Sequence, residues 1–281
     1  AQLVQDPSPV DASTMKDDPA YQLFTFSAPG LPSHQMINVE KFPTDDINVR
    51  KAMIYAVNSD EIMENASMGL TPAAHSIISP TTWGYNPDAD NMYPYDLEKA
   101  KSILEEAGWI DSDGDGIREK DGEKLTIEYP ALPAYEEQFM ELLTYALQDA
   151  GFEVNLQMLD DAGITAVGQE GAHNILNMGW ISPDPSALNY VFLSSNIDGG
   201  SAYTRFRDER LDEILTIAPK TVDAEERKAL YGEAQQIIME NALIIPIHIY
   251  SSMYLADSEI QGFAFDGEGY PVLYDIWLGS N

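Results

Sequence analysis

The sequence predicts an α/β fold in which a mixed, mostly parallel sheet is flanked by helices. From residue 124 onward, short apolar segments alternate with longer segments of helical period, which is typical of parallel strands joined by helical crossovers. With 44% hydrophobic and 10% aromatic residues, the 281-residue chain can bury a substantial core. The most apolar run, residues 242–250, has the length of a strand and is far shorter than the roughly 18 to 20 apolar residues of a membrane helix.

The first 45 residues are rich in proline, aspartate and serine and contain two alternating segments, residues 21–26 and 35–39. Alternation of apolar and polar side chains predicts strands joined by loops. Because no helical pattern lies near them, we expect these strands to belong to a sheet whose other members are absent from the chain.

Three helices are predicted next. Asp46 precedes apolar residues at helical spacing and is expected to cap the first helix. Ser59 is expected to cap the second, which ends at Gly69, and Asp96 the third, which ends at Gly108. The irregular segment between the second and third helices is rich in proline and aromatic residues.

The alternating part of the chain follows. Strands are predicted at residues 125–129, 152–159 and 174–178, with helices at residues 135–150 and 162–169 between them. The later elements are helices at residues 186–193, 208–218 and 224–240 and a buried strand at residues 243–249.

The chain is strongly acidic, with 15 basic and 47 acidic residues and a net charge of −32. Such a charge repels nucleic acids and anionic membranes, so neither is an expected partner. It is typical of an acidic, soluble surface, and recruitment of cationic ligands is the alternative. The absence of cysteine excludes disulfides, thiolate zinc sites and a cysteine nucleophile.

A candidate binding segment follows the third strand of the alternating part. In open α/β sheets, ligands bind outside the carboxyl ends of the strands, which is where residues 179–185 are expected. Trp180 offers an apolar wall, Ile181 and Ser182 offer backbone amides, and Asp184 offers a carboxylate. The alternative is that Trp180 fills the end of the sheet while Asp184 caps the helix beyond Pro185.

Several segments in this order resemble the family 5 extracellular solute-binding proteins, which bind peptides, nickel complexes or some sugars. The segments that carry the resemblance are residues 45–52, 55–58, 95–101, 106–118, 179–185, 211–215, 234–238 and 245–247. Family members are about twice as long, so the resemblance implies that an N-terminal half is absent. It implies a lobe of the type II periplasmic-binding-protein fold at residues 46–240, flanked by strands of a partner lobe at residues 1–45 and a return segment at residues 241–281.

The resemblance also implies a function. It predicts a monomeric, non-enzymatic component of an ABC importer that captures peptides or similar small solutes outside the cytoplasmic membrane and delivers them to a membrane permease. Peptide-binding relatives place an aspartate shortly after the tryptophan, where this chain has Ser182 and Pro183, so the resemblance carries over more safely to Trp180 than to Asp184. The alternatives are a carboxylate-based hydrolase and a sensor or scaffold protein with the same fold.

Further candidates lie outside that segment. Trp83 and Tyr203 could line the cleft, or could instead pin loops to the lobe. Asp111, Asp113 and Asp115 begin like a calcium loop, but the twelfth position is Gly122 rather than glutamate, which leaves Glu119 or Asp121 to substitute. The alternative is a metal-free connector between a helix and a strand, and no cofactor is expected.

Overall fold

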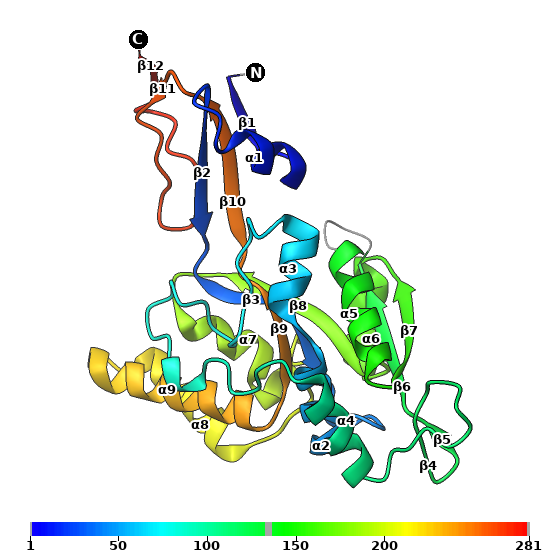
Figure 1. Cartoon of the computed structure of the whole chain (residues 1–281). Helices are drawn as coiled ribbons and strands as arrows, with labels where there is room; N and C mark the ends of the chain where they lie inside the picture. Colours follow the sequence, from blue (N-terminus) through cyan, green and yellow to red (C-terminus); the bar gives the residue numbers. More distant parts are fainter. Residues whose placement is uncertain (1, 133–136, 280–281) are drawn as a thin grey trace.

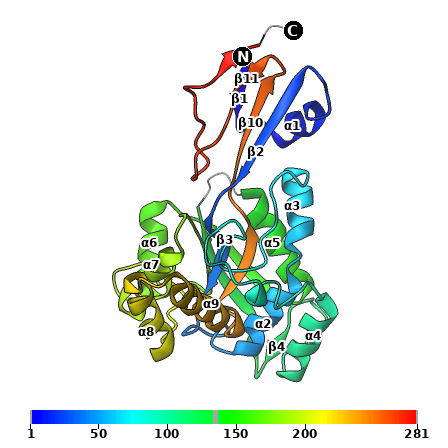
Figure 2. The same ribbon diagram turned by 90° about the vertical axis from the view of Figure 1, so that its left-hand side faces the viewer.

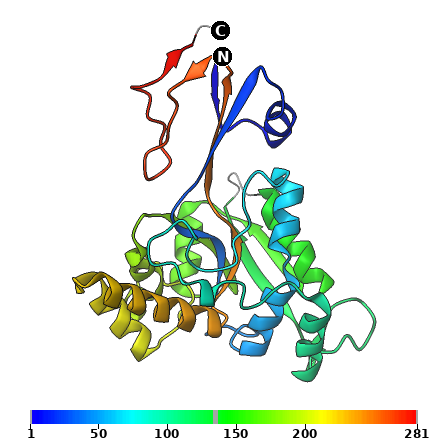
Figure 3. The ribbon, with the colours of Figure 1, turned by 60° about the vertical axis from the view of Figure 1, so that its left-hand side comes forward.

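The structure, a computed structural model, describes residues 2–132 and 137–279. The chain forms a broad α/β body, residues 30–249, and a narrow upper part, residues 2–27 and 251–279 (Figure 1). β1 (Leu3–Gln5) and β12 (Trp277–Leu278), the first and last described strands, both lie in the upper part in all three views of the whole chain (Figures 2 and 3).

The helices are α1 (Pro9–Met15), α2 (Ile47–Ala56), α3 (Ser59–Ser67), α4 (Leu97–Glu106), α5 (Glu137–Asp149), α6 (Asp161–Glu170), α7 (Leu188–Phe192), α8 (Glu209–Ile217) and α9 (Ala224–Glu240). The strands are β1 (Leu3–Gln5), β2 (Tyr21–Ser27), β3 (Gly30–Ile37), β4 (Glu119–Lys120), β5 (Glu123–Lys124), β6 (Thr126–Ala131), β7 (Glu153–Met158), β8 (Ile175–Ile181), β9 (Ile244–His248), β10 (Ser251–Asp257), β11 (Ile260–Gln261) and β12 (Trp277–Leu278). These elements occupy nearly all the segments in which the sequence predicts helices and strands. The first two residues of the helix expected at 135–150 lie outside the described residues.

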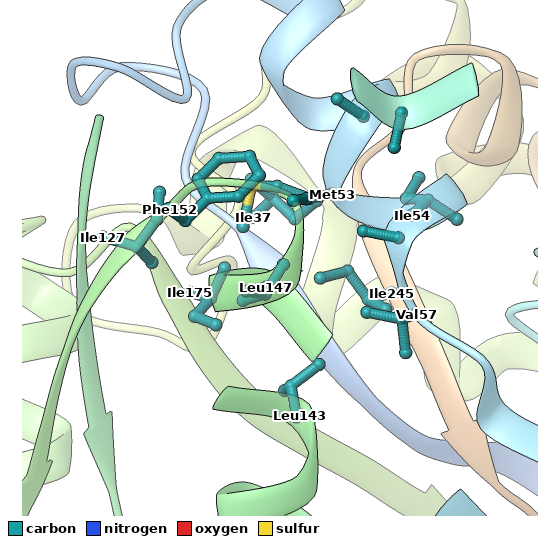
Figure 4. Close-up of a cluster of buried hydrophobic side chains, with 14 of the residues drawn as sticks. Ile37, Met53, Ile54, Val57, Ile127, Leu143, Leu147, Phe152, Ile175 and Ile245 are labelled. Atoms are coloured by element: carbon teal, nitrogen blue, oxygen red, sulfur yellow. The ribbon is translucent and has the colours of Figure 1, made fainter. Parts of the chain in front are cut away.

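A three-stranded antiparallel sheet, in the order β8-β3-β9, forms the centre of the body. Successive side chains of a strand point to opposite faces, so each strand contributes to two cores. Ile37, at the end of β3, belongs to the core that packs against α2 and α5, whereas its neighbour Met36 belongs to the core beneath α8 and α9. Figure 4 shows the first core, in which Ile37 and Ile175 of the sheet lie near Leu147 of α5.

The expectation of a mostly parallel sheet is wrong. Only β6 and β7, joined by the crossover helix α5, pair in parallel, while the other described strand pairs are antiparallel. The chain enters the body from the upper part along β3 and leaves it along β9, and this passage makes the two strands antiparallel. Strand and helix periodicity cannot reveal this, because it depends on which strands become neighbours.

Local capping signals predict most helix ends. The side chains of Asp46 and Asp96 accept hydrogen bonds from backbone amides in the first turns of α2 and α4, as expected. The cap predicted at Ser59 is wrong: Asn58 caps α3, and the Ser59 hydroxyl instead donates to the Pro246 carbonyl. Ser59 therefore links α3 to β9 through a buried hydrogen bond of 2.7 Å.

Two chain segments connect the body to the upper part, residues 28–30 and residues 249–251, and we call this region the crossing. The Ala28 amide donates to the Tyr250 carbonyl at 2.8 Å, so the two segments are bonded to each other. Gly30 has a φ of +118°, and a Cβ atom there would lie 2.2 Å from the Trp180 carbonyl oxygen. Glycine is therefore required for β3 to approach β8 so closely at the crossing.

The lobe boundaries expected at residues 45 and 241 remain predictions. β3 lies within residues 1–45 and β9 within residues 241–281, and both pair inside the body. The upper sheet, in the order β1-β10-β2, combines segments from the early and the late part of the chain. The expectation that the strands at residues 21–26 and 35–39 lack their sheet partners in this chain is therefore wrong, because β2 pairs with β10 and β3 pairs with β8 and β9. Within the two described ranges, no helix has both the length and the apolar character needed to cross a membrane.

Among the buried side chains of the central sheet is His34 of β3. Its Nδ1 lies 2.7 Å from the Pro32 carbonyl oxygen, and its Nε2 has no hydrogen-bond partner among the described residues. Burial lowers the pKa of His34 from 6.5 to about 4, with the bond to Pro32 opposing the shift.

This burial predicts a pH-dependent loss of stability. Between pH 6.5 and 4 the unfolded chain binds a proton at His34 that the folded chain does not, so the free energy of unfolding should fall as the pH drops through this window. The loss should total about 3 kcal/mol and stop below pH 4. Urea unfolding of the His34→Gln variant at pH 7 and pH 4.5 should show a smaller loss than the wild type and the His75→Gln control. Equal losses in all three proteins would contradict this assignment.

Core packing gives a second prediction. Leu147 of α5 is fully buried, so Leu147→Ala should lower the free energy of unfolding by about 2–5 kcal/mol, through lost burial and the cavity left behind. Gln148, the next residue of α5, is exposed, and Gln148→Ala should change stability by less than about 0.5 kcal/mol. Denaturant titration of both variants checks the contrast, and similar losses would show that α5 does not pack as described.

Candidate functional site

A cavity of about 660 Å³ lies beside the crossing, and we call it the crossing cavity. Its lining comes from the carboxyl end of β6, the beginning of α5, the first half of β8 and the connection between β9 and β10. Segments of the upper part, near β1 and in β10, complete it. Its position fits the rule that ligands bind beyond the carboxyl ends of parallel strands, since β6 is one of the two parallel strands.

Three rings form one wall of the crossing cavity. The ring of His248 lies 5.1 Å from that of Phe139 and 5.3 Å from that of Tyr250, the latter in an edge-on arrangement. Tyr250 lies close against β8, because a Cβ atom added at Gly179 would be only 2.4 Å from the tyrosine hydroxyl. The absence of a side chain at Gly179 therefore gives the Tyr250 ring its place at the crossing.

Polar groups interrupt this apolar lining. The Asn177 side chain lines the cavity and donates to the Ser33 hydroxyl at 3.0 Å, which fixes its orientation. Thr71 and Ser251 also contribute to the lining. An apolar cavity with a few oriented polar groups suits an amphipathic small molecule.

Trp180 and Ile181 are the last two residues of β8, not part of a turn after the strand as the sequence predicts. They pair with Leu31 and Gly30 of β3, and this pairing extends β8 beyond the expected end at residue 178. The Trp180 ring stacks on that of Tyr190 at 5.2 Å, with 8° between the ring planes. Both rings remain accessible, since Trp180 is 44% and Tyr190 59% exposed.

Ser182 and Asp184 are engaged in local hydrogen bonds. The Ser182 amide donates to the Pro29 carbonyl at 3.1 Å, and its hydroxyl donates to the Asp184 carbonyl. The Asp184 carboxylate accepts the Ser186 amide and two hydrogen bonds from Arg227 Nη2, at 2.7 and 2.8 Å. Partial burial opposes ionisation, but the hydrogen bonds from Ser186 and Arg227 lower the pKa of Asp184 below its usual value.

Arg227 also connects Asp184 to Trp83. The guanidinium carbon lies 5.2 Å from the centre of the Trp83 ring, a cation–π contact, while the ring is still 41% exposed. Tyr203 lies elsewhere: it is buried against His173 and Gly168. The structure thus brings Trp83 and Asp184 together through one arginine and places Tyr203 in the core, where it does not suit direct contact with a solute.

Sequence reasoning missed the residues that form the cavity wall. His248 lies near the end of the buried strand predicted at residues 243–249, and Tyr250 follows that strand directly, which was the available signal. Phe139 offered no such signal, because in the sequence it is one of several apolar residues of a predicted helix. Tyr190 and Arg227 likewise become significant only through their contacts with Trp180 and Asp184.

The acidic loop before β4 is stabilised by its own backbone. Carboxylate oxygens of Asp111, Asp113, Asp115 and Glu119 lie within 4.8 Å of one another. Asp111 accepts hydrogen bonds from the amides of Gly114 and Gly116. Hydrogen bonds from the Ile117 amide and from Lys124 lower the pKa of Asp115. The loop therefore has a metal-free explanation, and calcium binding at Asp111, Asp113 and Asp115 stays the alternative to the expected metal-free connector.

Comparisons with known proteins agree with this architecture. The family described as bacterial extracellular solute-binding proteins, family 5 Middle, matches residues 1–200. The dipeptide-binding protein of Escherichia coli (strain K12) is 29% identical over 272 residues, which are 95% of this chain and 49% of that protein. The nickel-binding periplasmic protein of the same organism is 30% identical over 237 residues, which are 80% of this chain and 44% of that protein.

Solved structures show the same fold. The oligopeptide-binding protein AppA from Bacillus subtilis, in complex with a nonapeptide, superposes with a TM-score of 0.81 at 23% identity and covers 99% of this chain and 56% of that one. The chain spans about half the length of the curated relatives it matches. On the match to residues 1–200, the chain belongs to the bacterial extracellular solute-binding proteins of family 5, which bind solutes and are not enzymes.

Proposed function

We propose that this chain forms one lobe of the substrate-binding component of an ABC importer. In this proposal it captures a peptide or a similar small solute outside the cytoplasmic membrane and delivers it to a membrane permease. The three relatives compared above are named for dipeptide or nickel binding or hold a nonapeptide, which supports an importer of small solutes.

The observation that carries the proposal is the position of the crossing cavity. It lies where the body meets the strands of the upper part, so a solute there would touch both. A rotation of one part against the other would then change the cavity, and bound solute would favour the closed arrangement. The permease would recognise that closed shape.

The proposed contacts divide into two sets. Phe139, His248 and Tyr250, which line the cavity, would hold the apolar body of the solute. The accessible stack of Trp180 on Tyr190 lies outside that lining, at the end of β8, and would supply a second apolar contact. Ile181, also exposed, would extend this second contact.

The segment that follows β8 would be held in place by Ser182, Asp184 and Trp83, which would support the site without contacting the solute. Their hydrogen bonds and the contact with Arg227 fix the segment that follows β8, and so support Trp180 in its place.

Loss of the aromatic wall should weaken binding. Solute that co-purifies with the protein is identified by mass spectrometry and then titrated by calorimetry. Tyr250→Ala should raise the Kd by about tenfold or more, because an aromatic contact with the solute is lost, while Tyr274→Ala, at an exposed residue outside the cavity lining, should not change it. If Tyr250→Ala bound as well as wild type, the crossing cavity would not be the binding site.

Solute binding should also be visible in fluorescence. A solute that covers the exposed face of Trp180 should change the tryptophan emission, and Trp180→Phe should remove that change. Trp277→Phe, at an exposed residue of β12 in the upper part, is the matched control and should keep it. A signal that survives in the Trp180→Phe variant would place Trp180 outside the site.

A lobe that supplies only one side of a two-lobed cleft should bind poorly by itself. We expect the 281-residue chain to bind the solute at least about tenfold more weakly than a protein of the relatives' length that contains it, because part of the contact surface is lost. Calorimetry on both proteins checks this difference. Equal affinities would mean that the crossing cavity is complete within this chain.

A further inference from the structure

The crossing cavity has an uneven charge distribution. Among the described residues that line it, Asp6 is the only carboxylate, and none is a lysine or an arginine. The rest of the lining is apolar, aromatic or neutral, apart from the titratable ring of His248. A negative charge beside apolar walls, without a fixed positive charge to balance it, attracts cations and repels anions.

Asp6 is held in place by its backbone. Its φ of +46° lies in the left-handed region, and its amide donates to the carbonyl of Met253 in β10 at 2.9 Å. Met253 lines the same cavity. The bond therefore fixes Asp6 to the strand that borders the crossing.

The carboxylate of Asp6 is uncompensated. Among the described residues it has no hydrogen-bond or ion-pair partner. The charge of Asp6 also acts on a neighbouring residue, because burial and this charge together raise the pKa of the Tyr254 phenol. Asp184, the acidic residue closest in sequence to Trp180, is by contrast already bound to Arg227.

On the basis of the function proposed above, we infer that the crossing cavity selects solutes that carry a protonated amine on an apolar body, with Asp6 as the partner of the amine. The apolar body would lie along the rings of Phe139, His248 and Tyr250. A charged amine placed against an unpaired carboxylate gains a charge-assisted hydrogen bond. A solute whose only charge is a carboxylate would instead be repelled.

The test compares three probes that share one apolar body. Leucyl-phenylalanine amide is a cation, its N-acetylated form is neutral, and N-acetyl-leucyl-phenylalanine is an anion. Calorimetric titration of the intact protein, freed of bound solute, should show the cation binding about tenfold more tightly than the neutral probe. The anion should bind more weakly than either.

Variants then identify the residue responsible. Asp6→Asn removes the charge and keeps a side chain that tolerates a positive φ, so the preference for the cation should disappear while the neutral probe binds as before. Asp17→Asn, at an exposed carboxylate after α1 with no hydrogen-bond or ion-pair partner among the described residues, makes the same charge change outside the cavity and should keep the preference. Melting temperatures of both variants confirm that each is folded.

The outcomes separate the two proposals. If all three probes bind equally, or if the folded Asp6→Asn variant keeps the preference, the assignment of Asp6 is overturned while solute binding at the cavity stands. If no probe binds and Tyr250→Ala has no effect on the co-purified solute, both the proposed site and the inference built on it fail.

Discussion

The structure depends on how two segments of the chain pass through the crossing together. The hydrogen bond from the Ala28 amide to the Tyr250 carbonyl joins them, and the close approach of Gly30 to β8 sets their distance from the central sheet. Any residue with a Cβ at position 30 would meet the backbone of Trp180 and Ser182. The sheet, the cavity and the exposed end of β8 all take their positions from this contact.

Below the crossing, buried polar groups connect the elements that the two cores alone would leave loosely oriented. Asn174 donates to the Thr44 hydroxyl and accepts the amide of Glu128, which joins the start of β8 to β6 and to the segment before α2. Arg50, also buried, donates to the carbonyls of Thr44 and Asn241. These side chains satisfy backbone groups that would otherwise be costly to bury, so they position the helices as well as stabilise them.

The sequence was informative about local structure and much less so about the site. Capping residues such as Asp96 and apolar periodicity identify helices, because both effects act within one or two turns. The direction of β3 relative to β8 depends on contacts between residues more than a hundred positions apart, and no local pattern encodes it. The same holds for the crossing cavity, whose wall joins Phe139 to His248. Trp180, which the sequence marks by its position after the third strand of the alternating part, is an accessible ring, whereas no sequence pattern points to its partner Tyr190, and the binding role of Trp180 remains a proposal.

The arrangement of the upper sheet also bears on the order in which the protein folds. Gln22 of β2 donates to the carbonyl of Asp257, 235 residues later, and the whole pairing of β2 with β10 spans similar separations. Closing so long a loop in an unfolded chain is entropically costly, whereas a folded body brings residues 28 and 250 together in advance. The body should therefore act as the template on which the upper sheet assembles last. On a ribosome, β1 and β2 would wait unpaired until β10 emerges, a period in which their exposed edges must be protected from association.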